Sequence, residues 1–147
     1  DGVEHPRNLG LIARAAYAAG AYGLVIPSRG NVLVDDTVIQ SSAGTALRLP
    51  IARCTNLTQC LRECKRAGFW VYGLSANART SLYEATLAEK AVYVLGNESR
   101  ELSHSTEKSC DALLSIPMAG EADSLNVALA AAVTLFEVHR RRLVALS

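Results

Sequence analysis

The chain has 147 residues, half of them hydrophobic and a fifth charged, which favours one packed domain and excludes a disordered chain. Its net charge of +1 and aromatic content of 5% do not indicate a strongly basic nucleic-acid binder or a base-stacking reader of single-stranded RNA. The longest apolar run, residues 125–136, is shorter than the roughly 20 residues that a membrane span requires. With no recognisable signal or transit peptide, we expect a soluble, cytoplasmic protein without membrane contact.

Apolar periodicity between glycine and proline breakers predicts alternating helices and strands. The expected elements are a helix at 9–19, a strand at 23–27, a helix at 36–43, a strand at 50–53, a helix at 57–67, strands at 69–74, 91–95 and 112–116, and a helix at 124–143. This order predicts an α/β fold with a mostly parallel sheet and helices on both faces. Ligands bind at the carboxyl ends of such strands, which here are Ile26, Leu74, Leu95 and Ile116.

No repeat or linker divides the chain, so residues 1–147 are interpreted as a single domain. The opening residues 1–3 look like the tail of a strand, and we expect a fragment that is trimmed at its N-terminus. The four cysteines, at 54, 60, 64 and 110, lack C-x-x-C spacing, and the histidines are scattered. We therefore expect reduced, partly buried thiols and no metal site.

Several common enzyme fingerprints are missing from the sequence. There is no G-x-G-x-x-G after a strand, no G-x-x-x-x-G-K-[ST] phosphate loop and no G-x-S-x-G nucleophile elbow. A dinucleotide enzyme, an NTPase and a serine hydrolase are therefore disfavoured, and an unrelated α/β nucleotide enzyme remains only a weak alternative.

The first segment that points to chemistry is residues 5–14. Asn8 is a good helix cap, and Gly10 lies four residues before Arg14, on the same helical face. Glycine weakens a helix by about 1 kcal/mol, so we expect Gly10 to clear space beneath the guanidinium of Arg14. The alternative is an ordinary cap followed by a surface arginine.

The second and third segments follow two of the predicted strands. Residues 92–98 run from a buried strand into Gly96-Asn97-Glu98, which is either a ligand-contacting loop or a polar turn. Residues 116–120 and 124–127 form the third segment, in which Ser124 can cap the last helix. Met118 is more often core filler than a ligand contact. The stripe expected to face the core comprises Leu125, Ala128, Leu129, Ala132, Val133 and Phe136.

Together, N-x-G-x-x-x-R at 8–14, G-N-E at 96–98, I-P-M at 116–118 and S-L-N-V at 124–127 resemble the signature motifs of the SpoU/TrmH (SPOUT) methyltransferases, in the family's order. The resemblance covers essentially the whole chain, and Ser42-Ala43-Gly44 is similar as well. It implies a C-terminal deep trefoil knot, a homodimer and S-adenosylmethionine as cofactor. The implied reaction methylates a ribose 2′-hydroxyl in structured RNA, with ribosomal RNA favoured over transfer RNA. The resemblance also suggests a missing N-terminal RNA-binding domain.

The resemblance carries roles onto two sets of residues. The set implied to bind the cofactor is Ser75, Ala76, Leu95, Gly96, Asn97, Ile116, Met118, Ser124 and Leu125. The set implied to serve substrate binding and catalysis is Arg14, Asn8, Glu98, Ser124 and Asn126. A guanidinium is rarely neutral, so we expect Arg14 to bind the phosphate and stabilise the developing alkoxide instead of acting as the base.

Two positions depart from the family pattern, because Ser99 and Glu101 stand where glycine is expected. A positive φ at either would cost roughly 1 kcal/mol, and Glu101 adds negative charge near RNA. These departures keep open a second hypothesis, a catalytically weak or inactive RNA-binding or ribosome-assembly module on the same fold. The basic run 139–142 could touch phosphate, but such runs more often cover a helix end.

Overall fold

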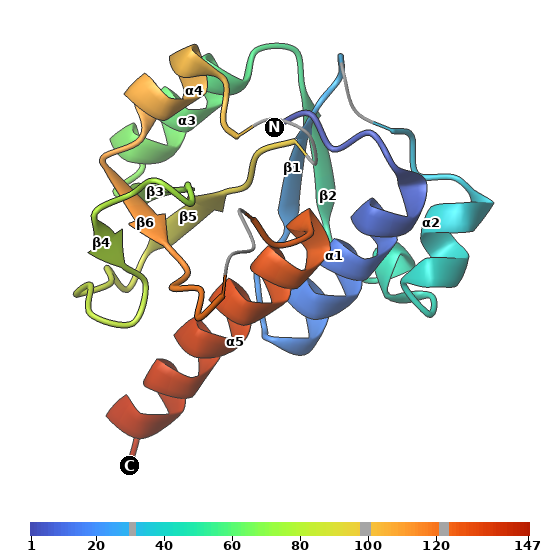
Figure 1. Ribbon diagram of the computed structural model, residues 1–147. Helices are drawn as coiled ribbons and strands as arrows, with labels where there is room; N and C mark the ends of the chain where they lie inside the picture. Colours follow the sequence, from blue (N-terminus) through green and yellow to red (C-terminus); the bar gives the residue numbers. More distant parts are fainter. Residues whose placement is uncertain (30–31, 98–100, 121–123) are drawn as a thin grey trace.

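The computed structural model describes residues 1–29, 32–97, 101–120 and 124–147. Its centre consists of two groups of parallel strands (Figure 1). β1 (Leu24–Pro27) pairs with β2 (Ile51–Cys54). The second group, in the order β4-β6-β3-β5, contains β3 (Trp70–Leu74), β4 (Thr80–Ser81), β5 (Ala91–Val94) and β6 (Ala112–Ser115). Every pairing is parallel, so the predicted α/β fold is confirmed.

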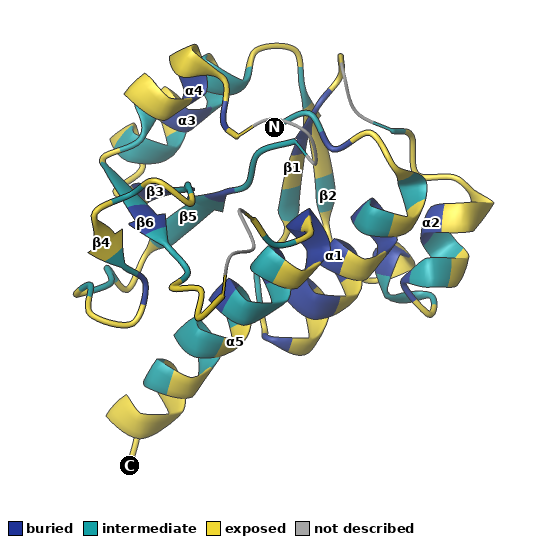
Figure 2. Ribbon diagram, in the orientation of Figure 1, coloured by how far each residue is buried: buried dark blue, intermediate teal, exposed yellow. Residues whose placement is uncertain are grey.

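Helices cover both faces of the strands, as predicted (Figure 1). The helices are α1 (Pro6–Ala18), α2 (Asp36–Ser41), α3 (Leu57–Arg66), α4 (His104–Ser109) and α5 (Val127–Ala145), with a 3₁₀ turn at Thr45–Leu47. Successive side chains of a strand point to opposite faces. Val71 packs with Leu61 of α3, whereas Tyr72 lies in the cluster that includes Val133 of α5. Figure 2 shows α1 and the start of α5 as the most deeply buried helical segments.

Two predicted helix caps are wrong. α1 begins at Pro6, with His5 at the N-cap, so Asn8 lies inside the first turn. Proline has a fixed φ and no N–H, which suits it to the first helical position. α5 begins at Val127, and Asn126 caps it by accepting a 2.9 Å hydrogen bond from the amide of Ala128. Ser124 therefore lies before the helix that it was expected to cap.

Two short elements were not predicted from the sequence. α4 has a polar six-residue sequence without an apolar stripe, and its one local signal is Ser103, whose hydroxyl accepts from the amide of Thr106. β4 is two residues long and exists because the chain lies beside β6. Neither element shows the periodicity on which the prediction depended.

Gly10 is required by the packing of α1 on α2 and not by Arg14. A Cβ at this position would lie 2.7 Å from the carbonyl oxygen of Val38 and would overlap the hydroxyl of Ser41. The glycine thus lets α1 approach α2 closely, and the expectation that it clears space beneath Arg14 is wrong. In the turn that follows α2, two successive residues have a positive φ, +52° at Ala43 and +77° at Gly44.

The predicted core stripe of α5 is only partly correct. Ala128 is buried, but Leu129 is 57% exposed and Phe136 is 47% exposed. α5 packs against α1 through small residues such as Ala131, and this close contact turns the larger apolar side chains outward.

Within the described ranges, no helix combines the length and apolar character needed to cross a membrane.

A cavity of about 450 Å³ separates β1 from β5. Apolar side chains of α1 and α5 line it on one side, and those of α3 line it on the other. The edges of β1 and β5 face each other across this space, so the two groups of strands do not form a continuous sheet.

Candidate active site

A second cavity, of about 190 Å³, lies at the carboxyl ends of β3, β5 and β6. The loops that follow these strands form its walls, and the start of α5 closes it. Three of the four strand ends that the sequence singled out, Leu74, Leu95 and Ile116, line this cavity. The parallel order of β6, β3 and β5 brings them together, because adjacent parallel strands end at the same edge.

The structure gathers all of the predicted cofactor-binding residues around this cavity. They are Ser75, Ala76, Leu95, Gly96, Asn97, Ile116, Met118, Ser124 and Leu125. Leucine, isoleucine and methionine side chains supply apolar walls, and serine and main-chain groups supply polar contacts. An apolar lining with a few polar groups is typical of sites that bind a small organic molecule. That these residues hold the cofactor stays a prediction.

Gly96 permits a close approach of two chain segments. A Cβ at position 96 would lie 2.7 Å from the carbonyl carbon of Glu101 and 2.8 Å from the nitrogen of Leu102. Both are main-chain atoms that cannot swing aside. Glycine is therefore required where the β5 loop folds back to form one wall of the cavity.

Glu101 also lines the cavity, although the sequence did not predict it among the cofactor-binding residues. Its carboxylate accepts hydrogen bonds from the hydroxyl of Ser75 at 2.8 Å and from the amide of Ala76 at 2.9 Å. The side-chain amide of Asn77 lies 3.5 Å away. The φ angle of Glu101 involves Arg100, which lies outside the described residues, so the strain considered from the sequence stays a prediction. Ser99 and Glu98 lie outside the described residues.

Asn97 joins the β5 loop to the beginning of the chain. Its side-chain amide donates to the carbonyl oxygen of Gly2 at 2.7 Å and to the carboxylate of Glu4 at 3.0 Å. Beside it, the carbonyl oxygen of Leu95 accepts from the main-chain nitrogen of Asp1 at 2.8 Å. The side chain of Asn97 thus joins the wall of the cavity to the beginning of the chain.

Two of the predicted catalytic residues meet at the junction of α1 and α5. The side-chain amide of Asn126 lies 3.3 Å from Oδ1 of Asn8, to which it donates a hydrogen bond. Since Asn126 also caps α5, this contact fixes the start of α5 beside the first turn of α1. Ser124 stands two residues earlier, in the cavity wall.

Arg14 is not brought to the cavity. It is exposed on α1, does not line the cavity, and makes no hydrogen bond or ion pair with any residue in the described ranges. Leu11 and Tyr17, at helical spacing on either side of it, are 40% and 42% exposed. A single chain therefore does not unite the predicted catalytic set.

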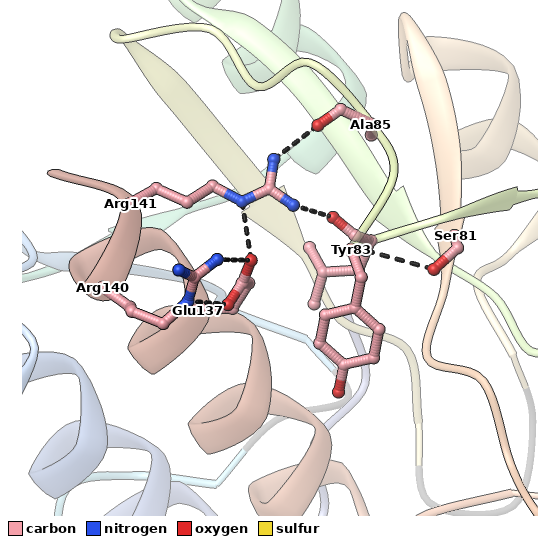
Figure 3. A network of polar contacts seen from close by, with 7 residues as sticks. Ser81, Tyr83, Ala85, Glu137, Arg140 and Arg141 are labelled. Atoms are coloured by element: carbon pink, nitrogen blue, oxygen red, sulfur yellow. Dashed lines mark hydrogen bonds and ion pairs between the residues drawn. The ribbon is translucent and has the colours of Figure 1, made fainter. Parts of the chain in front are cut away.

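The basic run near the C-terminus is partly structural (Figure 3). Glu137 pairs with Arg140 at 2.8 Å and with Arg141 at 2.7 Å, and these hydrogen bonds lower its pKa to about 2. Arg141 also donates to the carbonyl oxygens of Leu82 and Ala85, which ties α5 to the loop after β4. Neither arginine lies in the last turn of α5, where the basic residue is Arg142, so these contacts do not test the expectation that the run covers a helix end.

The cysteines are free and half-buried, as expected. Burial raises the pKa of Cys110 to about 11, and burial followed by the proximity of Cys60 raises the pKa of Cys54 and Cys64. In the part of the chain that the structure describes, no group of three or more His, Cys, Asp or Glu side chains is arranged to hold a metal ion.

Comparison with known proteins decides the family. The sequence profile described as the SpoU rRNA Methylase family matches residues 1–136. The chain belongs to the SpoU methylase family. A curated relative, the 23S rRNA (guanosine-2′-O-)-methyltransferase RlmB of Xanthomonas axonopodis pv. citri, is 47% identical over 143 residues. That match covers 97% of this chain and 57% of the relative, so the chain spans a little over half of the relative's length.

Solved structures of SpoU proteins agree with this fold. The methyltransferase AviRb of Streptomyces viridochromogenes, determined in complex with AdoMet, superimposes with a TM-score of 0.89 at 32% identity. The alignment covers 97% of this chain and 56% of AviRb. The A. aeolicus TrmH/SpoU tRNA modifying enzyme gives a TM-score of 0.84 at 29% identity, covering 97% of this chain and 72% of that one. The resemblance stated from the motifs is therefore confirmed.

Proposed function

We propose that this chain is the catalytic domain of an RNA ribose 2′-O-methyltransferase that uses S-adenosylmethionine. The observation that carries the proposal is the single cavity at the ends of β3, β5 and β6, which gathers every residue assigned to the cofactor from the motifs. The AdoMet complex of AviRb, a relative of the same fold, supports the choice of cofactor. The cofactor would supply the methyl group from its sulfonium.

The cavity suits such a cofactor on physical grounds. Leu95, Leu125 and Met118 offer apolar surface to an adenine ring, and the hydroxyl of Ser75 offers a hydrogen bond. Methyl transfer requires in-line attack by the ribose oxygen, so correct positioning supplies much of the rate. Arg14 would hold the neighbouring phosphate and stabilise the developing alkoxide while the hydroxyl proton passes to solvent water. Asn8, Glu98 and Asn126 would orient the ribose and Arg14.

Structured RNA is the proposed substrate, with ribosomal RNA first and transfer RNA second. The curated relative RlmB is named as a 23S rRNA guanosine methyltransferase, and a structural relative is named as a tRNA modifying enzyme. The higher identity belongs to the ribosomal enzyme, which favours that substrate. A cytoplasmic location is proposed with it, because the named substrates of these relatives are cytoplasmic RNAs.

A homodimer is proposed because one chain leaves Arg14 away from the cavity. Leu11, Tyr17, Leu129 and Phe136 are exposed on the adjacent helices α1 and α5. Burying this apolar face against a second copy would place Arg14 within the interface. Arg14 of one subunit would then complete the cavity of the other.

Subunit mixing tests this arrangement. Arg14→Ala removes the phosphate-binding group, and Gly96→Val collapses the cavity against the main chain of Glu101. Each variant alone should be inactive, and heterodimers of the two should regain methylation, because one of their sites has both an intact cavity and an Arg14. Mixed samples that form dimers without regaining activity would place Arg14 in the cavity of its own subunit.

We also propose that a parallel strand fills the 450 Å³ cavity between β1 and β5 and joins the two groups of strands into one sheet. The amide of Leu24 bonds to β2, so the main chain of Val25 faces the cavity. On the other side, β5 bonds to β3 through Lys90, so Ala91 and Tyr93 face the cavity. The bond from Asp1 to Leu95 continues this edge, and residues ahead of Asp1 would extend along it.

Hydrogen exchange tests the added strand. In the protein expressed from its natural start, the amides of Val25 and Tyr93 should exchange as slowly as the amide of Leu24, which donates to the carbonyl oxygen of Pro50. Fast exchange at Val25 and Tyr93 beside slow exchange at Leu24 would show that the edges stay open. An RNA-binding domain ahead of the strand is proposed with it, since the curated relatives are longer than this chain.

The trefoil knot is proposed from the family resemblance. The residues that carry this resemblance are the motifs at 96–98, 116–118 and 124–127. Stretching the chain from its ends by single-molecule force tests it. A knotted chain should extend to less than its full contour length, and full extension would exclude the knot.

The proposed activity is tested with calorimetry and a methylation assay. S-adenosylmethionine should bind with one site per chain, and transcribed 23S rRNA should gain a 2′-O-methyl group in its presence. An Arg14→Ala variant should keep cofactor binding and lose methylation. Cofactor binding by the intact protein without methylation of any ribosomal or transfer RNA would favour the inactive RNA-binding module.

A further inference from the structure

The strongest feature that the proposed function leaves unexplained is the carboxylate of Glu101 inside the cofactor cavity. Its two oxygens accept from the hydroxyl of Ser75 and the amide of Ala76, two of the residues assigned to the cofactor. The side-chain amide of Asn77 approaches the same carboxylate, and the amide of Asn77 donates to the hydroxyl of Ser75. The polar end of the cavity is thus occupied by a side chain of the protein.

We propose that Glu101 is a built-in competitor that must leave these donors before S-adenosylmethionine can bind. Hydrogen bonds to a carboxylate are stronger than those to a neutral acceptor. When a hydroxyl or ring nitrogen of the cofactor replaces Glu101, Ser75 and Ala76 therefore exchange a strong acceptor for a weaker one. Its main chain is held against Gly96, so the side chain vacates the donors by rotating about its own bonds. The residue is exposed, which gives the displaced carboxylate access to water.

Glu101 therefore sets the cofactor affinity of this chain below that of a chain with a small residue at the position. The inference rests on the proposed cofactor site, and it adds a residue that the motifs treated only as a departure. The alternative is that the carboxylate, held by Ser75 and Ala76, itself binds the ribose hydroxyls of the cofactor. The two readings predict opposite effects of removing it.

Titration calorimetry with S-adenosylmethionine separates them. Glu101→Ala frees Ser75 and Ala76 and should lower the dissociation constant about tenfold, which corresponds to about 1.4 kcal/mol. Glu101→Gln keeps one acceptor oxygen and should give an intermediate value. Glu84→Ala, which removes an exposed carboxylate outside the cavity, is the matched control and should bind as the unmodified chain does.

Each outcome bears on a different part of the account. Weaker binding by Glu101→Ala would make Glu101 a cofactor ligand and overturn its role as a competitor. Unchanged binding would overturn that role as well. Either result would leave the proposed function standing. Absence of binding by every variant would instead contradict the proposed function. Hydrogen exchange supplies a second readout, because the amide of Ala76 should exchange faster in ligand-free Glu101→Ala than in the unmodified chain.

Discussion

Asn126 donates a hydrogen bond from its side-chain amide to Oδ1 of Asn8, 118 positions away in the sequence, at 3.3 Å. The same Asn126 caps α5 through its own Oδ1. One side chain therefore fixes both the start of the last helix and its position beside the first. The first and third motifs of the sequence meet at this contact.

The two tasks of Asn126 can be separated by substitution. Asn126→Ala should lower the free energy of unfolding by about 1 kcal/mol, because the cap of α5 is lost. Asn126→Ser keeps a capping oxygen but is too short to reach Asn8, so it should approach the stability of the unmodified chain and lose methylation activity. Urea unfolding and a methylation assay measure the two effects. Equal activity of Asn126→Ser and the unmodified chain would remove the Asn8 contact from the catalytic arrangement.

The elements of the fold could be predicted because most of them carry local signals. Apolar strands bounded by glycine or proline, such as 91–95, and long apolar helices were placed within a few residues. The six-residue α4 and the two-residue β4 were missed because tertiary contacts, not periodicity, make them.

The candidate site was predicted through motifs, and its limits have physical reasons. Residues such as Gly96 and Met118 line one cavity because their motif loops follow β5 and β6, which both pair with β3 in a parallel sheet. The position of Arg14 could not be predicted, since its distance from the cavity depends on how α1 packs. Gly10 was misread because its close neighbour, Ser41 of α2, is remote in sequence and invisible to helical spacing.

Gly10→Ala tests the packing of α1 on α2. The added methyl group would overlap Ser41 and press on the carbonyl of Val38, so unfolding free energy should fall by about 1–3 kcal/mol, as expected for overpacking. Gly120→Ala is the control, because a Cβ there meets nothing within 4 Å. Thermal unfolding of both variants measures the difference. Equal stability of the two would mean that α2 yields without cost.

The ion pairs of Glu137 predict a pH dependence of stability. Hydrogen bonds from Arg140 and Arg141 lower its pKa from 4.5 to about 2 in the folded chain. A carboxyl group with a lowered folded pKa contributes stability that is fully present above the unfolded value and is lost as pH falls. Glu137→Gln should therefore cost roughly 1 kcal/mol at pH 7, and the difference should shrink between about pH 4.5 and 2.

Urea unfolding at several pH values measures this effect for the unmodified chain and Glu137→Gln. Glu107→Gln is a suitable control, since it removes an exposed carboxylate on α4. A stability difference that stays constant from pH 7 to pH 2 would show that the loss comes from packing and not from the charge of Glu137.

S-adenosylmethionine is proposed to bind where the loops after β3, β5 and β6 converge. Met118 is the single methionine of the sequence and lies in the wall of that cavity, so a ¹³C-methyl label reports from one known place. Titrating the labelled protein with S-adenosylmethionine should shift the Met118 methyl resonance with a saturating curve, at the same dissociation constant as calorimetry gives. A resonance that stays unmoved up to millimolar cofactor would contradict the account.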